Sequence, residues 1–190
     1  MELPTPHSIF IEKQLQQIRD RKGKNAFLES IMTDHSATTL NVTKGHRTVM
    51  FPGSNGPKTS TWEQTKRMAF ALNEAGIDVA FLPEIPGTVC SDSLLRIGNT
   101  YRLADFKYCI TTKSNTLAKE LEHGFEQANT IVLKLKNMDV GLLKETLGYL
   151  VRNEISHGSI LLINKYGKIV ELTKNEINTG MYKKTIKGFL

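Results

Sequence analysis

The chain has 190 residues, 39% of them hydrophobic, which is enough to bury a core in one compact domain with extensions. The formal net charge is +6 at pH 7 and the sequence pI is about 9.3, so polyanionic partners such as nucleic acid are favoured. The two cysteines, Cys90 and Cys109, form neither a CxxC pair nor a disulfide framework, which argues against structural zinc and for a reducing compartment.

Export and membrane insertion have no signal in the sequence. No apolar run approaches the ~20 residues needed to span a bilayer. The first residues, MELPTPHSIFIEK, contain an acid and prolines instead of the basic and apolar regions of a secretory signal. We therefore expect no membrane partner and a cytoplasmic location for the chain as found.

The N-terminal part predicts two helices and a hairpin. Residues 9–31 carry spaced apolar side chains among many charges, interrupted around Gly23, which indicates a helix, a turn and a short second helix. Residues 37–43 and 46–51 are rich in β-branched residues around Lys44-Gly45 and predict a hairpin. The turn-forming stretch PGSNGPKTS follows, so we expect an N-terminal extension over residues 1–58 and a core over residues 59–190.

The predicted core begins with a helix. Apolar residues between positions 61 and 75 fall on one helical stripe, and Gly76 follows as a stop signal. Three strands are predicted next, at residues 77–85, 93–97 and 100–111. A helix, a strand, a second helix and a final hairpin are then predicted in turn, at residues 115–128, 130–135, 140–153, 159–164 and 168–172. Thr173 and Glu176 have the spacing of a capping box and predict a short terminal helix.

This order of elements predicts the fold class α/β (α+β), with a mixed β-sheet flanked by helices. Along the third strand the two-residue alternation places Asp105 and Lys107 on one face. Four residues are expected on the other face, buried against helices: Ala104, Phe106, Tyr108 and Ile110. An acid and a base therefore project together.

A second carboxylate lies on the preceding strand. Twelve residues separate Asp92 from Asp105, a distance that a hairpin can close. Two carboxylates and a backbone carbonyl, that of Phe106, suit a hard cation such as Mg²⁺ or Mn²⁺, which offsets phosphate charge and acidifies a bound water. Lys107 would orient that water or stabilise the transition state. The alternative is a simple ion pair on a strand face, worth under ~1 kcal/mol.

The order of Glu63 in a helix, Asp92 after Ser91, and the run Asp105-Phe106-Lys107 resembles the active-site pattern of the PD-(D/E)xK nuclease superfamily. More closely, the segments ALNEAGIDVAFLPE, SDSLLRIGNTYRLADFK and FEQANTIVLKL resemble the C-terminal tRNase domains of contact-dependent growth inhibition toxins. The resemblance covers about residues 61–135 and implies a restriction-endonuclease-like core. It also implies tRNA as substrate, an immunity protein as partner and action in a target cell's cytoplasm.

The chain departs from that pattern at two positions. Ser91 stands where a proline usually precedes the first acid, which leaves the carboxylate of Asp92 in place. Glu63 lies opposite the apolar stripe of its helix, so it is either a further catalytic residue or a solvated first-turn acid that suits the helix dipole.

Further residues are candidates for contact with nucleic acid. Thr111, Thr112 and Lys113 follow the long strand, where hydroxyls and an ammonium can meet a phosphate. Lys183 and Lys184 belong to a lysine-rich tail that can follow a nucleic-acid backbone. For both groups the alternative is a polar or basic face that serves solubility.

Three functions fit these observations. The first is a metal-dependent nuclease, with Asp92, Asp105, Lys107 and Glu63 as catalytic residues and the two aspartates as metal ligands. The second is a metal-independent, barnase-like ribonuclease in which His46, Lys107 and Thr111 share acid–base work. The third is a catalytically inactive nucleic-acid-binding module of a mobile element.

Overall fold

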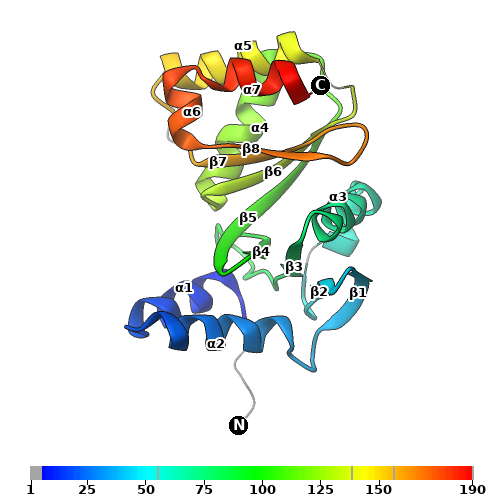
Figure 1. Cartoon of the computed structure of the whole chain (residues 1–190), viewed down its shortest axis with the longest axis vertical. Coiled ribbons are helices and arrows are strands. Elements are labelled where there is room, and N and C mark those ends of the chain that lie inside the picture. The colour runs from blue at the N-terminus through cyan, green and yellow to red at the C-terminus, as the bar shows by residue number, and fades with distance from the viewer. Residues whose placement is uncertain (1–5, 55, 138, 156, 190) are drawn as a thin grey trace. The chain divides into compact units, whose positions relative to one another are not determined.

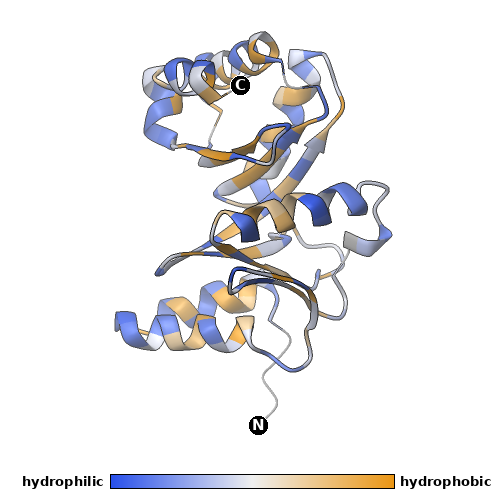
Figure 2. Ribbon diagram, turned by 45° about the vertical axis from the view of Figure 1, so that its right-hand side comes forward, coloured by the Kyte–Doolittle hydropathy of each residue, from blue (hydrophilic) through white to orange (hydrophobic). Residues whose placement is uncertain are grey.

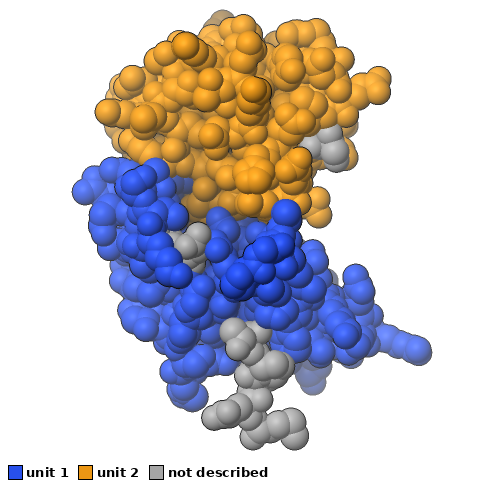
Figure 3. Space-filling model, turned by 180° about the vertical axis from the view of Figure 1, so that it is seen from behind, with its two compact units in different colours: residues 1–104 blue, residues 105–190 orange. Residues whose placement is uncertain are grey.

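The computed structural model describes residues 6–54, 56–137, 139–155 and 157–189. By packing, the chain forms two compact units, residues 1–104 and residues 105–190, coloured separately in Figure 3. The boundary falls inside one strand, and each unit is described by itself. The division into domains at residue 58, expected from the sequence, stays a prediction.

Unit 1 begins with the two helices that the sequence predicts. Helix α1 (Ser8–Gln17) starts where Nδ1 of His7 accepts a hydrogen bond from the amide of Phe10 at 3.1 Å. Helix α2 (Arg21–Met32) starts at Asp20, whose carboxylate accepts from the amide of Gly23 at 2.7 Å. Both caps satisfy amides that have no partner inside the helix.

The predicted hairpin is also confirmed. Strands β1 (Thr38–Thr43) and β2 (His46–Met50) pair antiparallel. Lys44 and Gly45 between them both have positive φ, 52° and 83°, as a two-residue hairpin turn that follows the strand twist requires. A short 3-10 turn, η1 (Gly56–Lys58), then leads to helix α3 (Trp62–Glu74), the helix predicted over residues 61–75.

The strands of unit 1 form a mixed sheet. Strands β3 (Ile77–Phe81), β4 (Ser93–Ile97) and β5 (Thr100–Cys109) follow β2 in that order across the sheet. Strand β3 runs parallel to β2 and antiparallel to β4, and β4 pairs with the first half of β5 in a register that joins Ser93 to Ala104. The expected mixed sheet is confirmed.

Helices cover both faces of this sheet (Figure 1). On one face, Ala80 and Leu82 share a core with Ile11 of α1 and Leu28 of α2. On the other face, helix α3 packs against β3, and the ring of Trp62 meets that of Phe81 edge-on at 5.0 Å between centroids. Both surfaces of β3 are therefore buried, which explains its continuous apolar run.

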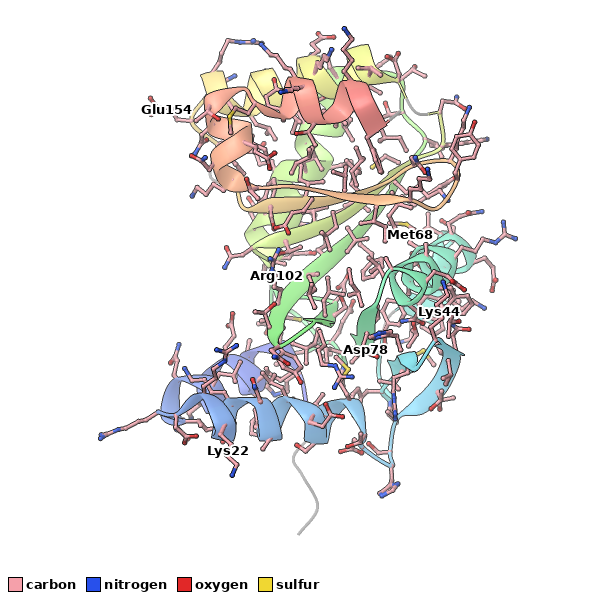
Figure 4. The ribbon with its side chains drawn as sticks, in the orientation of Figure 1. Lys22, Lys44, Met68, Asp78, Arg102 and Glu154 are labelled. Carbon is pink, nitrogen blue, oxygen red and sulfur yellow. The ribbon has the colours of Figure 1, made fainter. Side chains whose placement is uncertain are left out.

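A buried charge network links distant parts of unit 1. Asp78, labelled in Figure 4, is fully buried on β3. Its carboxylate accepts from Nε of Arg96 at 2.6 Å and from the amide of Arg47 at 2.7 Å. Arg96 also pairs with Glu29 of α2. A buried carboxylate needs such partners, so this network ties β2, β3, β4 and α2 together.

Unit 2 contains the second half of β5 and seven further elements. They are α4 (Ser114–Gln127), β6 (Thr130–Leu135), α5 (Val140–Arg152), β7 (Ser159–Ile163), β8 (Ile169–Leu172), α6 (Lys174–Thr179) and α7 (Tyr182–Phe189). The strand order is β5-β6-β7-β8, with β6 and β7 parallel and β7 and β8 antiparallel. Every strand and helix predicted for this region is present.

One core holds unit 2 together. Apolar residues of all four helices meet Ile131 and Leu133 of β6 and Ile160 and Leu162 of β7. Figure 2 shows the hydrophobic stretches of these strands and the mixture of hydrophobic and hydrophilic residues along the helices. Because these strand residues alternate with their neighbours, the helices lie on the same face of the sheet.

The C-terminus differs from the sequence expectation in one respect. The capping box at Thr173 and Glu176 is present, and it opens α6. Gly180, with φ of 75°, then ends α6, and α7 follows as a second helix where one short terminal helix is predicted. A left-handed residue such as Gly180 terminates a helix, so the chain must restart.

Among the described residues, no helix is long and apolar enough to cross a membrane.

Candidate active site around Asp105

Asp105 lies on the helix-covered face of its strand, not on a polar one. Asp105, Lys107 and Cys109 share a face of β5, as the alternation predicts, and Cys109 belongs to the core formed with α4 and α5. Asp105 is accordingly 1% exposed. Of the four residues expected to be buried on the opposite face, Ala104 and Phe106 are buried, whereas Ile110 is 68% exposed just beyond the end of β5.

The carboxylate of Asp105 lies next to the ammonium of Lys107. Nζ of Lys107 lies 2.9 Å from its Oδ2, and the side chain of Lys107 is 15% exposed. Apart from this ion pair, neither oxygen of Asp105 has a hydrogen-bond partner among the described residues. The carboxylate therefore keeps lone pairs that nothing in the described chain satisfies.

A glycine of helix α4 makes room for this carboxylate. A Cβ added at Gly124 would lie 2.9 Å from Oδ2 of Asp105 and 2.9 Å from Cδ1 of Ile131. Real Cβ atoms do not approach other atoms so closely, so any residue other than glycine would force one of these side chains to shift. The helix thereby shields Asp105 from water on the core side.

The surroundings of the Cys109 thiol make it a poor nucleophile. Burial raises the pKa of Cys109 to about 11, and the negative charge of Glu120 adds to the effect. Lys107 acts in the opposite direction on this pKa. The thiolate is the reactive form, so Cys109 is inert at neutral pH and serves as a small apolar residue.

A buried carboxylate with unsatisfied oxygens beside an ammonium can do two kinds of chemistry. It can ligate a hard divalent cation, for which carboxylate oxygens are the preferred ligands, or it can accept a proton from a water or hydroxyl. The orphaned oxygens of Asp105 fit a cation ligand. No group of three or more His, Cys, Asp or Glu side chains able to hold a metal ion occurs in the part of the chain that the structure describes.

Asp92, the second predicted carboxylate, belongs to unit 1. It precedes β4 and is half-buried, and its carbonyl accepts a hydrogen bond from the amide of Leu82 at 2.8 Å. The next residue, Ser93, donates its hydroxyl to the carbonyl of Ala104 at 2.9 Å. These bonds fix the backbone at Asp92 in unit 1, and its role as a metal ligand stays a prediction.

Glu63 has the setting of a solvated helix acid. It lies in the first turn of α3, its side chain is 70% exposed, and its carboxylate pairs with Nζ of Lys66 at 2.7 Å. This pair joins neighbouring residues of one helix face, where such contacts stabilise by a few tenths of a kcal/mol, about 0.2 to 0.5. The catalytic role of Glu63 also stays a prediction.

The predicted phosphate-contacting residues lie on the surface of unit 2. Thr112 and Lys113 are exposed between β5 and α4, and the hydroxyl of Thr111 accepts from the amide of Lys113 at 3.1 Å. Lys183 and Lys184 are exposed on α7. The structure leaves both groups accessible to a ligand, and their contact with nucleic acid stays a prediction.

Gly124 is the site residue that sequence reasoning missed. The signal was available, because an isolated glycine within the helical pattern SNTLAKELEHGFEQ costs about 1 kcal/mol against alanine and so points to a packing or functional reason. The helical pattern could not show that Gly124 lies next to Asp105 on β5, because these two residues belong to different elements of the chain.

Gly124→Ala is expected to lower both stability and any activity that depends on Asp105. The added Cβ must displace the carboxylate or Ile131, and such overpacking costs about 1 to 3 kcal/mol. Urea denaturation measures the loss. Gly188→Ala in α7 is the control, since nothing lies within 4 Å of its Cβ position. Equal stability of both variants would show that α4 does not press on Asp105.

Comparisons with known proteins show a similarity to a solved structure. No protein-family model matches the chain, and no curated protein matches it. Among solved structures, a CdiA-CT/CdiI toxin and immunity complex from Burkholderia pseudomallei is similar, with a TM-score of 0.46 and 20% sequence identity over 62% of this chain and 87% of that chain.

Proposed function

We propose that this chain is a metal-dependent nuclease that hydrolyses phosphodiester bonds, with Asp105 and Lys107 at its centre. One observation carries the proposal: a carboxylate that is 1% exposed, whose oxygens have no hydrogen-bond partner among the described residues, lies 2.9 Å from an ammonium. Such an arrangement is costly for folding alone, and a buried carboxylate whose oxygens lack hydrogen-bond partners calls for a functional explanation.

Asp105 would hold Mg²⁺ or Mn²⁺, with Asp92 as the second carboxylate that the sequence pattern supplies. When bound, the cation offsets phosphate charge and lowers the pKa of a bound water. Strand β5 fixes the backbone of Asp105, and the absence of a side chain at Gly124 leaves the room that its carboxylate occupies. Lys107 places a positive charge where charge develops on the phosphoryl oxygens.

Nucleic acid is the proposed substrate because the net charge is +6 and exposed lysines and threonines lie at the end of β5 and on α7. The preference for RNA, and for tRNA in particular, comes from the sequence resemblance alone. The same source supports an immunity protein as a partner that would block the site.

Incubation with total tRNA and with plasmid DNA, each in Mg²⁺, Mn²⁺ and EDTA, tests the proposal. Cleavage of at least one substrate is expected with a metal and not with EDTA, because the cation supplies the attacking water's acidity. Gel electrophoresis of the products shows which substrate is cut. If neither substrate is cut under any condition while both bind, the chain is an inactive binding module.

A metal-independent ribonuclease is the second candidate, and one observation in unit 1 favours it. Nδ1 of His46 lies 3.5 Å from Oδ2 of the buried Asp78, and the His46 side chain is 34% exposed. A carboxylate that orients an imidazole in this way leaves the other ring nitrogen for acid–base work. Cleavage that persists in EDTA and is lost in His46→Ala would select this candidate.

A further inference from the structure

The turn between β7 and β8 is built by one buried side chain. Asn164 is 3% exposed, and its Oδ1 accepts hydrogen bonds from the amides of Tyr166 and Lys168, each at 3.0 Å. Its backbone closes the same turn by accepting from the amide of Gly167 at 3.0 Å. A side chain that replaces backbone partners in this way gives a turn one fixed conformation.

This fixed turn presents an aromatic ring to solvent. Tyr166 is 72% exposed, the largest exposed fraction among the large hydrophobic side chains of the described chain. Nζ of Lys165 lies 4.9 Å from the centroid of its ring, a cation–π contact. A ring that remains 72% exposed with an ammonium on one side keeps a face open for another planar group.

The same turn is tied to the basic helix α7. Nδ2 of Asn164 donates to the carbonyl of Phe189, the last residue of α7, at 3.1 Å. Figure 1 shows the β7–β8 hairpin beside the C-terminal end of this helix. Lys187 lies two residues before Phe189 and is exposed, as are Lys165 and Lys168 in the turn. The surface formed by Lys165, Tyr166, Lys168 and Lys187 is called the hairpin surface below.

Few acids offset this charge. Residues 164–189 contain six lysines and two glutamates. Glu176 is engaged by its own helix start, where Thr173 donates to its carboxylate from both the amide and the hydroxyl at 2.9 Å. The hairpin surface therefore combines a strong positive potential with one stacking platform.

We propose that the hairpin surface binds a single strand of nucleic acid, with a base stacked on Tyr166 and phosphates held by the lysines. Charge complementarity and the exposed ring together favour this occupant, because single-stranded nucleic acid is bound by aromatic platforms inside basic grooves. An acidic protein or an anionic membrane would also be attracted by the lysines, but neither supplies the planar bases with which a single strand stacks on an aromatic ring. This proposal adds a binding surface to the proposed function. It rests on the proposed function in one point, that the partner is nucleic acid.

Fluorescence anisotropy with labelled single-stranded RNA and DNA of one sequence tests the stacking role. The assay uses the full chain carrying Asp105→Asn, in EDTA, so that cleavage does not interfere. Tyr166→Ala is expected to weaken binding of at least one strand about tenfold, and Tyr166→Phe to preserve it, because stacking needs the ring and not the hydroxyl. Comparing the affinities for the RNA and the DNA strand shows whether the surface prefers ribose or deoxyribose.

Heparin, a polyanion without bases, separates stacking from charge. Tyr166→Ala should bind heparin as the parent does. The proposal is wrong if this variant binds both strands as tightly as the parent does. It is also wrong if the affinity of the variant for heparin falls as much as its affinity for the strands, because then no base stacks on Tyr166. Circular dichroism confirms that the variant is folded, which is expected because the ring is exposed and its backbone bonds remain.

A salt series tests the lysines. Each phosphate contact to a single strand contributes about −0.7 to the slope of log K against log salt, so Lys165→Ala with Lys168→Ala should make the slope shallower by about 1.4. The control removes two exposed lysines elsewhere in unit 2, Lys119 and Lys136, and should leave the slope nearer that of the parent. An equal change in both double variants would mean that net charge alone governs binding.

Failure of this proposal and failure of the proposed function are distinguishable. The binding assay does not depend on metal or on cleavage, so a chain that never cuts nucleic acid can still show the Tyr166 effect. Conversely, metal-dependent cleavage with no effect of Tyr166 on binding would leave the nuclease in place and remove the hairpin surface.

Discussion

Asp105→Asn is expected to reduce cleavage by about 100-fold or more without lowering the melting temperature. The amide keeps the shape of the carboxylate but removes its charge, and with it the affinity for a cation. We expect folding to tolerate the loss of that charge, because burying a carboxylate carries a desolvation cost that disappears with the charge. The side chain of Lys107 is 15% exposed, so its ammonium keeps access to water in this variant.

Single-turnover cleavage rates and calorimetric melting measure the two effects. Glu122→Gln is the matched control, since it removes one negative charge from an exposed position of α4 in the same unit. The control should retain activity. A variant at Asp105 that melts at lower temperature and still cuts at the parental rate would show that the ion pair with Lys107 is structural, and the proposed active site would be wrong.

Gly158→Ala is expected to destabilise the protein by about 3 kcal/mol or more, or to prevent folding. A Cβ at Gly158 would lie 1.8 Å from the carbonyl oxygen of Asn129 and 2.6 Å from its carbon. That carbonyl accepts from the amide of Ser159 at 3.0 Å, so the backbone at Asn129 cannot move away without breaking the start of the β6–β7 pairing. The clash involves backbone on both sides and has no flexible group to absorb it.

Urea denaturation followed by circular dichroism measures this effect. Gly148→Ala in α5 serves as the comparison, because the nearest atom to its Cβ position is Nη1 of Arg152 at 3.1 Å, the far end of a flexible side chain. Its free energy of unfolding should change by less than about 1 kcal/mol, since helix propensity favours alanine. Similar stability of the two variants would contradict the close packing at Gly158.

Local patterns predicted most of the fold because local physics sets most of its elements. Gly76 ends α3 with φ of 85°, and Lys44 and Gly45 form the hairpin turn, as turn chemistry requires. The alternation along β5 correctly placed Asp105 and Lys107 on one face. It could not tell which face the helices cover, because that choice depends on the packing of α4, signalled only by the missing side chain at Gly124.

The buried polar contacts inside each unit could not be predicted from the sequence either, because they join residues far apart in the chain. Arg96 joins Asp78 and Glu29, residues separated from it by 18 and 67 positions, and nothing in the local pattern names these partners. The same applies to Asn164, which looks like an ordinary turn residue in the sequence and yet bonds to Phe189. Buried polar side chains acquire their partners only when the chain is folded.

The positions of the two cysteines have a practical consequence for following the folding of this chain. Cys90 is 8% exposed in unit 1 and Cys109 is 6% exposed in unit 2, so each unit encloses one thiol. A thiol reagent reaches either sulfur only when the surrounding core opens. Pulse labelling in increasing urea, read by mass spectrometry of the two peptides, therefore reports the opening of each unit separately. Equal labelling rates would mean that both units unfold in one cooperative step.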